Sequence, residues 1–339
     1  RRALESYLKY GYIPLEDGVK EAFHQDEQTS RTLEYAFDDF AVAQLAKALG
    51  KEQDYEALMQ RSENWRKVIN PKTGYCDGRH APKLSKKGKS DGGVFEDNTD
   101  YIHRKPYITE GATCHYTWYV PHDIPGLISV MGGRERFVEK LDSMFTEGRY
   151  WHGNEPCHQV AWLYSMAGAP EKTRERVTHI LQTEYNDTPG GLSGNDDAGQ
   201  MSAWQVFASM GFYPVCPGTP QYVLGGTQFQ RVVINQPGCR PFVIGQTENS
   251  GPLLNGEPLT RYCLTHEELL QGGTLLFQLG KEALEDHALP GLYRDQIPQV
   301  ADLRLADAVD AAEALLQPVR IPGKVIVHLK SRLLLKQRA

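Results

Sequence analysis

The sequence predicts a mainly α-helical fold, part of a toroid of paired helices, followed by a small antiparallel β subdomain. In the first two-thirds of the chain, apolar residues recur every three or four positions within segments that short turns separate, as in amphipathic helices. Beyond residue 218 the pattern changes to short runs of Val, Ile and Phe between Gly, Pro and Asn, which is typical of antiparallel strands. Paired helices with short links favour a toroid of helical hairpins, of which an (α/α) barrel is one form.

The helices are placed by their apolar spacing and their end signals. The chain opens in a helix-like segment, residues 2–8. The next helix runs from Ser30, a residue that can cap a helix, to Gly50, which suits a helix end. Further helices are expected at 54–68, 114–131, 133–146, 156–167, 170–185 and 197–211.

A long polar segment, residues 77–106, interrupts the helices and contains a strongly basic stretch, Lys83–Lys89. Loops of this length in compact domains are often functional, although a solvated insertion explains it equally well. Strands are expected at 222–224, 231–234, 242–244 and 274–277. The sequence thus divides into a helical region (1–218), a β subdomain (219–280) and an unassigned tail (281–339).

The composition excludes several function classes. Apolar residues make up 40% and charged residues 24% of the chain, as in soluble globular proteins. A net charge of −6 argues against a nucleic-acid partner. No apolar run reaches the roughly 20 residues of a membrane-spanning helix. The six cysteines form no CxxC pair, so they are expected to be buried free thiols rather than zinc ligands.

Three acidic motifs stand next to expected helix starts. The first contains Glu110, the second is the run 151–156 with Glu155, and the third is Gly194-Asn195-Asp196-Asp197-Ala198-Gly199. In a toroid the inner helices direct their ends at a shared cavity, where such acids would converge. Two carboxylates facing a sugar are what glycoside hydrolysis requires. The apolar and aromatic neighbours of Glu110 favour a proton-holding acid, and the polar neighbours of Asp197 favour an ionised base.

Structural roles explain each motif alone equally well. Asn195 or Asp196 can cap the helix that follows. Glu155 before Pro156 fits a first helical turn. Asn154, Glu155, Asp196 and Asp197 are also hard oxygen ligands, which suit Ca²⁺ better than zinc. For the nearby histidines, hydrogen bonding or packing is a better explanation than metal binding.

The three motifs together carry a family resemblance. Glu110-Gly111, the run from Tyr116 to Ile128, the run His152–Pro156, and the third motif continued to Val215 closely resemble the calcium-dependent exo-α-mannosidases of glycoside hydrolase family 92. The resemblance covers roughly residues 1–280. It implies an (α/α)6 toroid between an N-terminal β-sandwich and a small β subdomain. It also implies inverting hydrolysis of terminal α-mannosides of oligosaccharides or glycoprotein glycans, with Ca²⁺ at the O2 and O3 hydroxyls of the mannose.

The resemblance assigns roles to individual residues. Glu110 matches the general acid and Asp197 the general base. Asn154 and Glu155 fall in the motif expected to hold the calcium. The remaining candidates for contacting the sugar, or for supporting the residues that do, are Asn195, Asp196, Trp118, His122 and Asp123.

The chain also departs from the family pattern. Members are about twice as long, so the N-terminal β-sandwich and the first barrel helices are expected only in a longer parent, which would be periplasmic, secreted or at the cell surface. The segment Ala112-Thr113-Cys114-His115 replaces a common family sequence, so contacts with the leaving sugar are expected to differ. Two alternatives stay open: another (α/α)-barrel glycosidase, or a non-catalytic carbohydrate-binding remnant.

Overall fold

The computed structural model describes residues 3–18, 25–248 and 251–279. The chain forms two compact units. Of the described residues, unit 1 comprises 3–18, 25–186, 192–228 and 260–269, and unit 2 comprises 187–191, 229–248, 251–259 and 270–279. This division differs from the predicted boundary at 218, because unit 1 includes strands of the expected β subdomain. The predicted tail, 281–339, lies outside the described residues.

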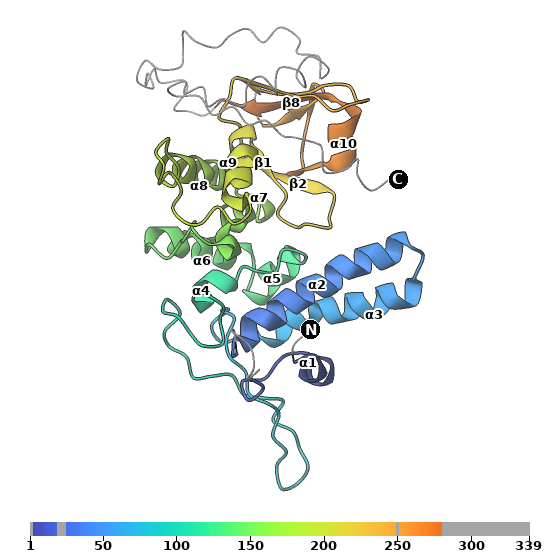
Figure 1. Cartoon of the computed structure of the whole chain (residues 1–339), viewed down its shortest axis with the longest axis vertical. Helices are drawn as coiled ribbons and strands as arrows, with labels where there is room; N and C mark the ends of the chain where they lie inside the picture. The colour runs from blue at the N-terminus through green and yellow to red at the C-terminus, as the bar shows by residue number, and fades with distance from the viewer. Residues whose placement is uncertain (1–2, 19–24, 249–250, 280–339) are drawn as a thin grey trace. The chain divides into compact units, whose positions relative to one another are not determined.

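Unit 1 is mainly helical, as the sequence predicts (Figure 1). Its helices, with the 3-10 turns marked η, are α1 (Leu4–Tyr10), α2 (Gln28–Ala48), α3 (Glu52–Ser62), η1 (Glu63–Lys67), α4 (Thr113–Tyr116), α5 (Ile124–Val130), α6 (Arg134–Thr146), η2 (Glu155–Cys157), η3 (Val160–Trp162), α7 (Leu163–Met166), α8 (Pro170–Thr183) and α9 (Gln200–Met210). Helix α10 (His266–Gln271) begins in this unit. None of the described helices is long and apolar enough to cross a membrane.

Helices α2 and α3 form an antiparallel hairpin (Figure 1). Gly50 lies between them with a φ of +67°, a left-handed conformation that glycine adopts without steric cost. The buried Asp39 of α2 accepts hydrogen bonds from the Arg61 guanidinium of α3 at 3.1 and 2.9 Å. It also accepts one from the Tyr7 hydroxyl of α1 at 2.9 Å. This charge-assisted contact ties the first three helices together.

Two predicted helices are broken. The helix expected over 114–131 becomes α4 and α5, because Pro121 disfavours helical backbone before it and Asp123 caps a new start by accepting from the Gly126 N–H at 2.8 Å. The helix expected over 156–167 becomes η2, η3 and α7. There the Gln159 amide donates to the Pro156 carbonyl at 2.9 Å, which competes with regular helical bonds.

The core of unit 1 is built from large aromatic side chains. Trp65, Trp118, Trp162 and Trp204 are completely buried. Trp162 stacks on Tyr213, with ring centroids 5.5 Å apart. Four of the six cysteines are buried and all six are free, as predicted, but Cys239 is exposed.

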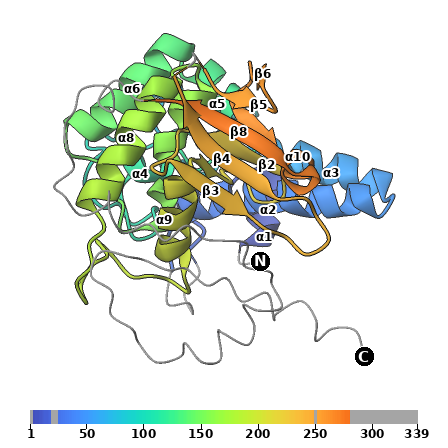
Figure 2. The same ribbon diagram turned by 90° about the horizontal axis from the view of Figure 1, so that it is seen from above.

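The strands form two separate sheets. In unit 1, β1 (Phe212–Tyr213), β2 (Gln221–Leu224) and β7 (Cys263–Thr265) form an antiparallel sheet in the order β1-β2-β7. The second sheet, in unit 2, has the order β3-β4-β8-β5-β6 (Figure 2). Its strands are β3 (Arg231–Ile234), β4 (Phe242–Thr247), β5 (Leu253–Leu254), β6 (Glu257–Pro258) and β8 (Gly273–Gln278).

The predicted small antiparallel β region is found, except that one of its strand pairs is parallel. Strands β4 and β8 run parallel over six residue pairs, from Phe242↔Gly273 to Thr247↔Gln278, whereas the other pairs are antiparallel. A parallel pair requires a long crossover connection. Residues 248–272 supply it, and they include β7 and α10.

Candidate active site

The first turn of α2 holds the segment that delivers Glu110. Helix α2 has no side-chain cap. The first N–H groups of the helix bond instead to the segment before Glu110: those of Thr29 and Ser30 donate to the Tyr107 carbonyl at 3.1 and 3.3 Å. The Ser30 hydroxyl, predicted to cap the helix, instead accepts from the Thr109 N–H at 3.0 Å. These bonds satisfy helix N–H groups that would otherwise lack partners, and they fix residues 107–109 immediately before Glu110.

Glu110 has an unusual backbone conformation. Its φ is +52°, in the left-handed region that costs a non-glycine residue of order 1–3 kcal/mol. Strain of this kind persists where the surroundings determine the conformation. The side chain of Glu110 is exposed, so the apolar setting that the sequence predicted for it is not found.

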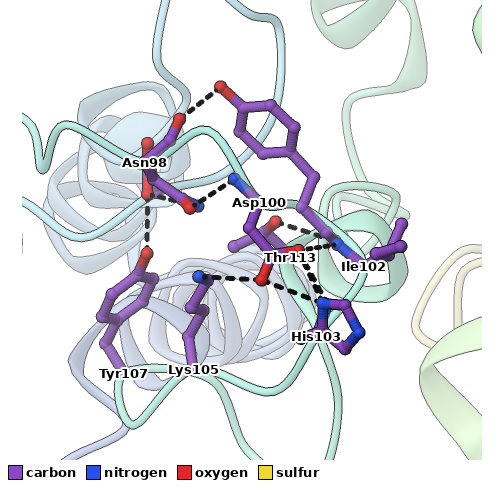
Figure 3. A network of polar contacts seen from close by, with 9 residues as sticks. Asn98, Asp100, Ile102, His103, Lys105, Tyr107 and Thr113 are labelled. Atoms are coloured by element: carbon purple, nitrogen blue, oxygen red, sulfur yellow. Dashed lines mark hydrogen bonds and ion pairs between the residues drawn. The ribbon is translucent and has the colours of Figure 1, made fainter.

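The loop before Glu110 is ordered by a polar network (Figure 3). The Asp100 carboxylate accepts from the Ile102 and His103 N–H groups, both at 3.3 Å, and contacts the His103 ring at 3.0 Å. Burial opposes ionisation of Asp100, but these hydrogen bonds hold its pKa at about 2. The Tyr101 carbonyl then accepts from the Cys114 N–H at 3.0 Å, which joins the loop to α4.

His115 links the start of α4 to the second acidic motif. Its Nδ1 accepts from the Ala112 N–H at 3.1 Å, so its Nε2 carries the proton and donates to the Arg149 carbonyl at 3.0 Å. Burial lowers the pKa of this imidazole. His115 is therefore a neutral positioning group rather than a metal ligand.

Two glycines bring the second and third acidic motifs together. A Cβ on Gly153 would lie 2.6 Å from the Ser193 carbonyl oxygen and 3.2 Å from the Gly194 Cα. A Cβ on Gly194 would in turn collide with the Gly153 carbonyl. The backbone just before Asn154 and the backbone just before Asn195 therefore approach each other to a distance that only glycine allows. Each glycine immediately precedes a candidate residue in the sequence, but the sequence alone does not reveal their mutual contact.

His152 fixes the same loop from inside the core. The Tyr185 hydroxyl donates to the Met201 carbonyl at 3.0 Å, so it accepts from His152 Nε2 at 2.6 Å, and His152 Nδ1 accepts from the Tyr150 hydroxyl at 2.8 Å. Burial lowers the pKa of His152 to about 3. The imidazole is thus neutral, with a single tautomer set by its two tyrosine partners.

His158 connects this loop to α9. Its Nε2 donates to the His152 carbonyl at 3.0 Å, and its Nδ1 accepts from the Gln200 amide at 3.3 Å. The Trp204 indole N–H donates to the His158 carbonyl at 2.8 Å. Gln200 is the first residue of α9, so the helix that follows Asp197 is joined directly to the loop that carries Glu155.

The third motif contains two acids with different partners. Asp196 accepts from the Ser202 N–H at 3.0 Å and from the Ser202 hydroxyl at 2.8 Å, so its side chain pairs with an N–H of the first turn of α9, although the N-cap position of that helix is Gly199. Asp197 and Ala198 both have positive φ, +46° and +56°, and Asp197 is exposed. Asn195 is exposed in the same loop.

Three carboxylates share one electrostatic environment. Burial raises the pKa of Glu155, a backbone hydrogen bond opposes this, and a hydrogen bond with Asp197 together with the charges of Asp197 and Glu110 raises it further. Like charges at close range disfavour ionisation. The structure therefore places Glu110 and Asp197, from two distant parts of the chain, within electrostatic reach of Glu155.

Three of the other candidates have structural roles. Trp118 is completely buried, edge-on to Phe137 with centroids 5.4 Å apart, so its side chain packs in the core, and of its two predicted roles only the support of sugar-contacting residues fits this burial. Asp123 caps α5 and pairs with Arg66 at 2.6 Å. The His122 Nε2 lies 3.0 Å from the Ser62 carbonyl, and its ring packs against Phe40, with centroids 5.4 Å apart.

A cavity of about 400 Å³ adjoins this region. His115, whose Nδ1 lies 3.0 Å from where a Gly111 Cβ would be, forms part of its wall. Trp151, 41% exposed, also lines it, and so does Arg149. Within residues 3–18, 25–248 and 251–279, no three His, Cys, Asp or Glu side chains are grouped to hold a metal ion.

Comparison with known proteins identifies relatives. A model of the glycosyl hydrolase family 92 catalytic domain matches residues 1–281. The inverting family GH92 mannosidase BT2199 of Bacteroides thetaiotaomicron VPI-5482 is 34% identical, with a TM-score of 0.71 over 81% of this chain and 39% of that chain. The family GH92 α-mannosidase BT3965 of Bacteroides thetaiotaomicron in complex with mannoimidazole is 34% identical, with a TM-score of 0.72 over 82% of this chain and 38% of that chain.

A curated relative agrees with these matches. An uncharacterized secreted glycosidase of Arthroderma benhamiae is 32% identical, with a match that covers 83% of this chain and 39% of the relative. The chain thus spans about two-fifths of the length of the relatives it matches. Since the family model matches residues 1–281 of 339, the chain belongs to glycosyl hydrolase family 92.

Proposed function

We propose that this chain carries the catalytic acids of an inverting exo-α-mannosidase that removes terminal mannose from oligosaccharides or glycoprotein glycans. The observation that carries the proposal is the cluster of Glu110, Glu155 and Asp197 in a family 92 chain. Two relatives are named as mannosidases, and one of them binds mannoimidazole. Their substrate class is the first to test here, beginning with α-1,2 linkages.

In the proposed mechanism, Glu110 protonates the departing glycosidic oxygen while Asp197 removes a proton from the attacking water. An inverting enzyme needs its two carboxyl groups about 6.5–9.5 Å apart, so that water fits between the base and the sugar. Asp197 lies three residues before the first residue of α9 and is exposed. Glu110 precedes α4 and is exposed to incoming substrate.

Asn154 and Glu155 are the proposed calcium ligands. Asn154 can ligate through its amide oxygen and Glu155 through its carboxylate oxygens, and Ca²⁺ prefers oxygen ligands. The negative charges around Glu155 also favour a bound cation. Because the described residues contain no group of three His, Cys, Asp or Glu side chains suited to a metal, the other ligands would be water and sugar hydroxyls. When bound, Ca²⁺ would orient the mannose hydroxyls. The residues of the chain then hold the ring and move the protons.

The 400 Å³ cavity is the proposed place for the rest of the glycan. Trp151 offers an aromatic face to a sugar ring, and Arg149 and Glu147 offer polar contacts to hydroxyls. The cavity wall includes Cys114 and His115, in the segment that departs from the family pattern. Recognition of the leaving sugar is therefore proposed to be particular to this chain.

A longer parent completes the proposed enzyme. We place the helices of unit 1 in an (α/α)6 toroid and expect an N-terminal β-sandwich before it. The parent is proposed to act outside the cytoplasm, as the secreted relative's name suggests for that protein.

A turnover assay on α-mannobioses of defined linkage tests the proposal, with the chain beside its longer parent, with and without Ca²⁺. Glu110→Gln and Asp197→Asn should each lower kcat by roughly two to four orders of magnitude, because each removes a proton-transfer group. Circular dichroism should be unchanged. The first product seen by NMR should be β-mannose, and chelation should reduce turnover reversibly.

Two results would replace the proposal. Preferred turnover of aryl α-glucosides or α-xylosides would assign the site to another sugar. Mannose binding by calorimetry without hydrolysis, in both the chain and its parent, would make the protein a carbohydrate-binding module.

A further inference from the structure

The segment from Arg79 to Phe95 forms an ordered hairpin that the proposed chemistry does not use. Two isolated antiparallel bridges, Arg79↔Phe95 and Leu84↔Ser90, join its two sides. In Figure 1 the hairpin extends away from the helices of unit 1. Every residue from 83 to 92 is exposed.

The base of the hairpin is fastened by Arg79. Its guanidinium donates to the carbonyls of Gly93 at 3.1 Å, Gly92 at 2.9 Å and Lys67 at 2.7 Å. It also lies over the rings of Tyr12 and Phe95, at 4.8 and 5.0 Å from their centroids. Such stacked, multiply bonded arginines are well suited to fixing backbone. These contacts give the base of the hairpin a defined conformation.

The tip is held in shape by side chains that bond to backbone. Asp91 accepts from the Lys83 and Gly93 N–H groups, both at 2.9 Å. The Ser85 hydroxyl accepts from the Lys89 N–H at 3.0 Å. The acidic and hydroxyl groups of the hairpin are thus occupied by its own backbone, which leaves the lysine ammonium groups facing outward.

The tip combines positive charge with an exposed apolar side chain. Lys83, Lys86, Lys87 and Lys89 form no ion pair with any described residue. Leu84, between them, is 73% exposed, more than any other large apolar side chain of the described residues. The protein as a whole carries a net charge of −6, but charges more than about 8 Å away are largely screened at physiological salt. A partner therefore meets a local cationic and apolar tip.

We propose that this hairpin docks the protein on an anionic phospholipid surface, with the lysines at the headgroups and Leu84 inserted among the acyl chains. Each lysine near an anionic leaflet strengthens binding about fivefold. Full burial of a leucine adds roughly tenfold or more. A soluble polyanion would use the lysines but would offer nothing to Leu84, so the observations favour a lipid surface.

The test measures co-sedimentation of the full chain with vesicles of phosphatidylcholine and phosphatidylglycerol, and with phosphatidylcholine alone. The variant with Gln at all four hairpin lysines should bind the anionic vesicles roughly a hundredfold or more weakly. Leu84→Ser should weaken binding roughly tenfold, and high salt should not remove that difference. A hairpin with Arg at the four positions should bind like the unaltered protein.

The matched control replaces four exposed lysines elsewhere by Gln: Lys47, Lys51, Lys67 and Lys72. It has the same net charge as the hairpin variant and should keep vesicle binding. The proposal would be overturned if both variants lost the same amount of vesicle binding. It would also be overturned if the hairpin variant still bound the anionic vesicles as well as the unaltered protein. Binding of an anionic polysaccharide without vesicle binding would assign the hairpin to a soluble polyanion and also overturn it. Because no turnover is measured, these outcomes are independent of the mannosidase proposal.

Discussion

Asp196 and Asp197 are neighbours in the chain, yet the structure gives them separate tasks. Asp196 bonds to Ser202 inside α9, whereas Asp197 interacts with Glu155 and His158. Local spacing predicts a structural role at the helix start for Asn195 or Asp196, but it does not show which partners Asp196 and Asp197 have. The structure separates them because three consecutive positive φ values, at Asp197, Ala198 and Gly199, turn the chain between Asp196 and the start of α9.

Single substitutions of the two acids should have different effects: one should lower stability and the other should lower turnover. Asp196→Ala removes the side-chain acceptor of a first-turn N–H of α9 and should lower the free energy of unfolding by about 1 kcal/mol, with turnover reduced only modestly. Asp197→Asn should abolish most turnover and leave the urea midpoint nearly unchanged. Urea unfolding and kinetics on the same preparations would check this. A larger stability loss in Asp197→Asn than in Asp196→Ala would contradict the assignment.

His152 should make stability depend on pH. Its pKa is about 3 in the folded protein and about 6.5 when unfolded, so the unfolded chain binds the extra proton. Its contribution is therefore fully present above pH 6.5 and is lost as the pH falls toward 3. Between pH 7 and 5 the free energy of unfolding should drop by about 2 kcal/mol from this residue.

Variants isolate that contribution. His152→Gln keeps a donor and an acceptor but does not titrate, so the difference between urea unfolding at pH 7 and pH 5 should shrink by about 2 kcal/mol. His179→Gln, at an exposed histidine, is the control and should leave the difference unchanged. An unaltered pH dependence in His152→Gln would mean that His152 is protonated in the folded state.

At the scale of elements, the contact of Gly153 with the loop of Gly194 positions two acids. Gly153→Ala would place a methyl group 2.6 Å from the Ser193 carbonyl, so the loops must separate. Overpacking of this kind costs about 1–3 kcal/mol, and a shift of about 1 Å at a catalytic group can cost about a hundredfold in rate. We expect both effects in thermal denaturation and kcat.

Gly190→Ala is the control, because nothing lies within 4 Å of its Cβ position. It should leave kcat and the melting temperature nearly unchanged. Full activity in both Gly153→Ala and Gly194→Ala would show that the two acidic loops do not need this contact.

The sequence predicted the regular helices well and the irregular ones poorly. Helices α2, α6 and α8 have clear apolar periodicity and end signals, and each lies within two residues of its predicted bounds. The region of η2, η3 and α7 was predicted as one helix, because buried residues on every side hide the breaks. The parallel pairing of β4 and β8 depends on contacts between distant segments, which local pattern does not contain.

The sequence predicts the acids of the candidate site, but not the residues that hold the loops carrying them. Carboxylates at helix starts are visible in the sequence, and the family resemblance joined three such motifs. The neutral histidines and paired tyrosines that hold these loops appear in sequence only as isolated polar and aromatic residues. Their hydrogen bonds join residues up to 46 positions apart, as between Trp204 and His158.

At the scale of the whole molecule, the chain passes between the two units five times, after residues 186, 191, 228, 259 and 269. Unfolding of either unit therefore frees the ends of segments that belong to the other, which favours a single cooperative transition. All five tryptophans lie in unit 1, at 65, 118, 151, 162 and 204, and the exposed Cys239 lies in unit 2.

Those positions allow a direct check. Tryptophan fluorescence reports on unit 1, and a fluorophore on Cys239 reports on unit 2. Their guanidinium unfolding curves should coincide in midpoint and slope. Two separated transitions would show that the units unfold independently.

The left-handed backbone at Glu110 and Asp197 also has a consequence for selection. Glycine would relax both positions, so a mutant library sorted only for heat tolerance should accumulate glycine there. A library sorted for sugar release should retain the acids. A position that is glycine in the first population and an acid in the second is one where the catalytic role lowers the stability of the fold. Ala198, with the same backbone conformation and no chemical role, is the position where both should accept glycine.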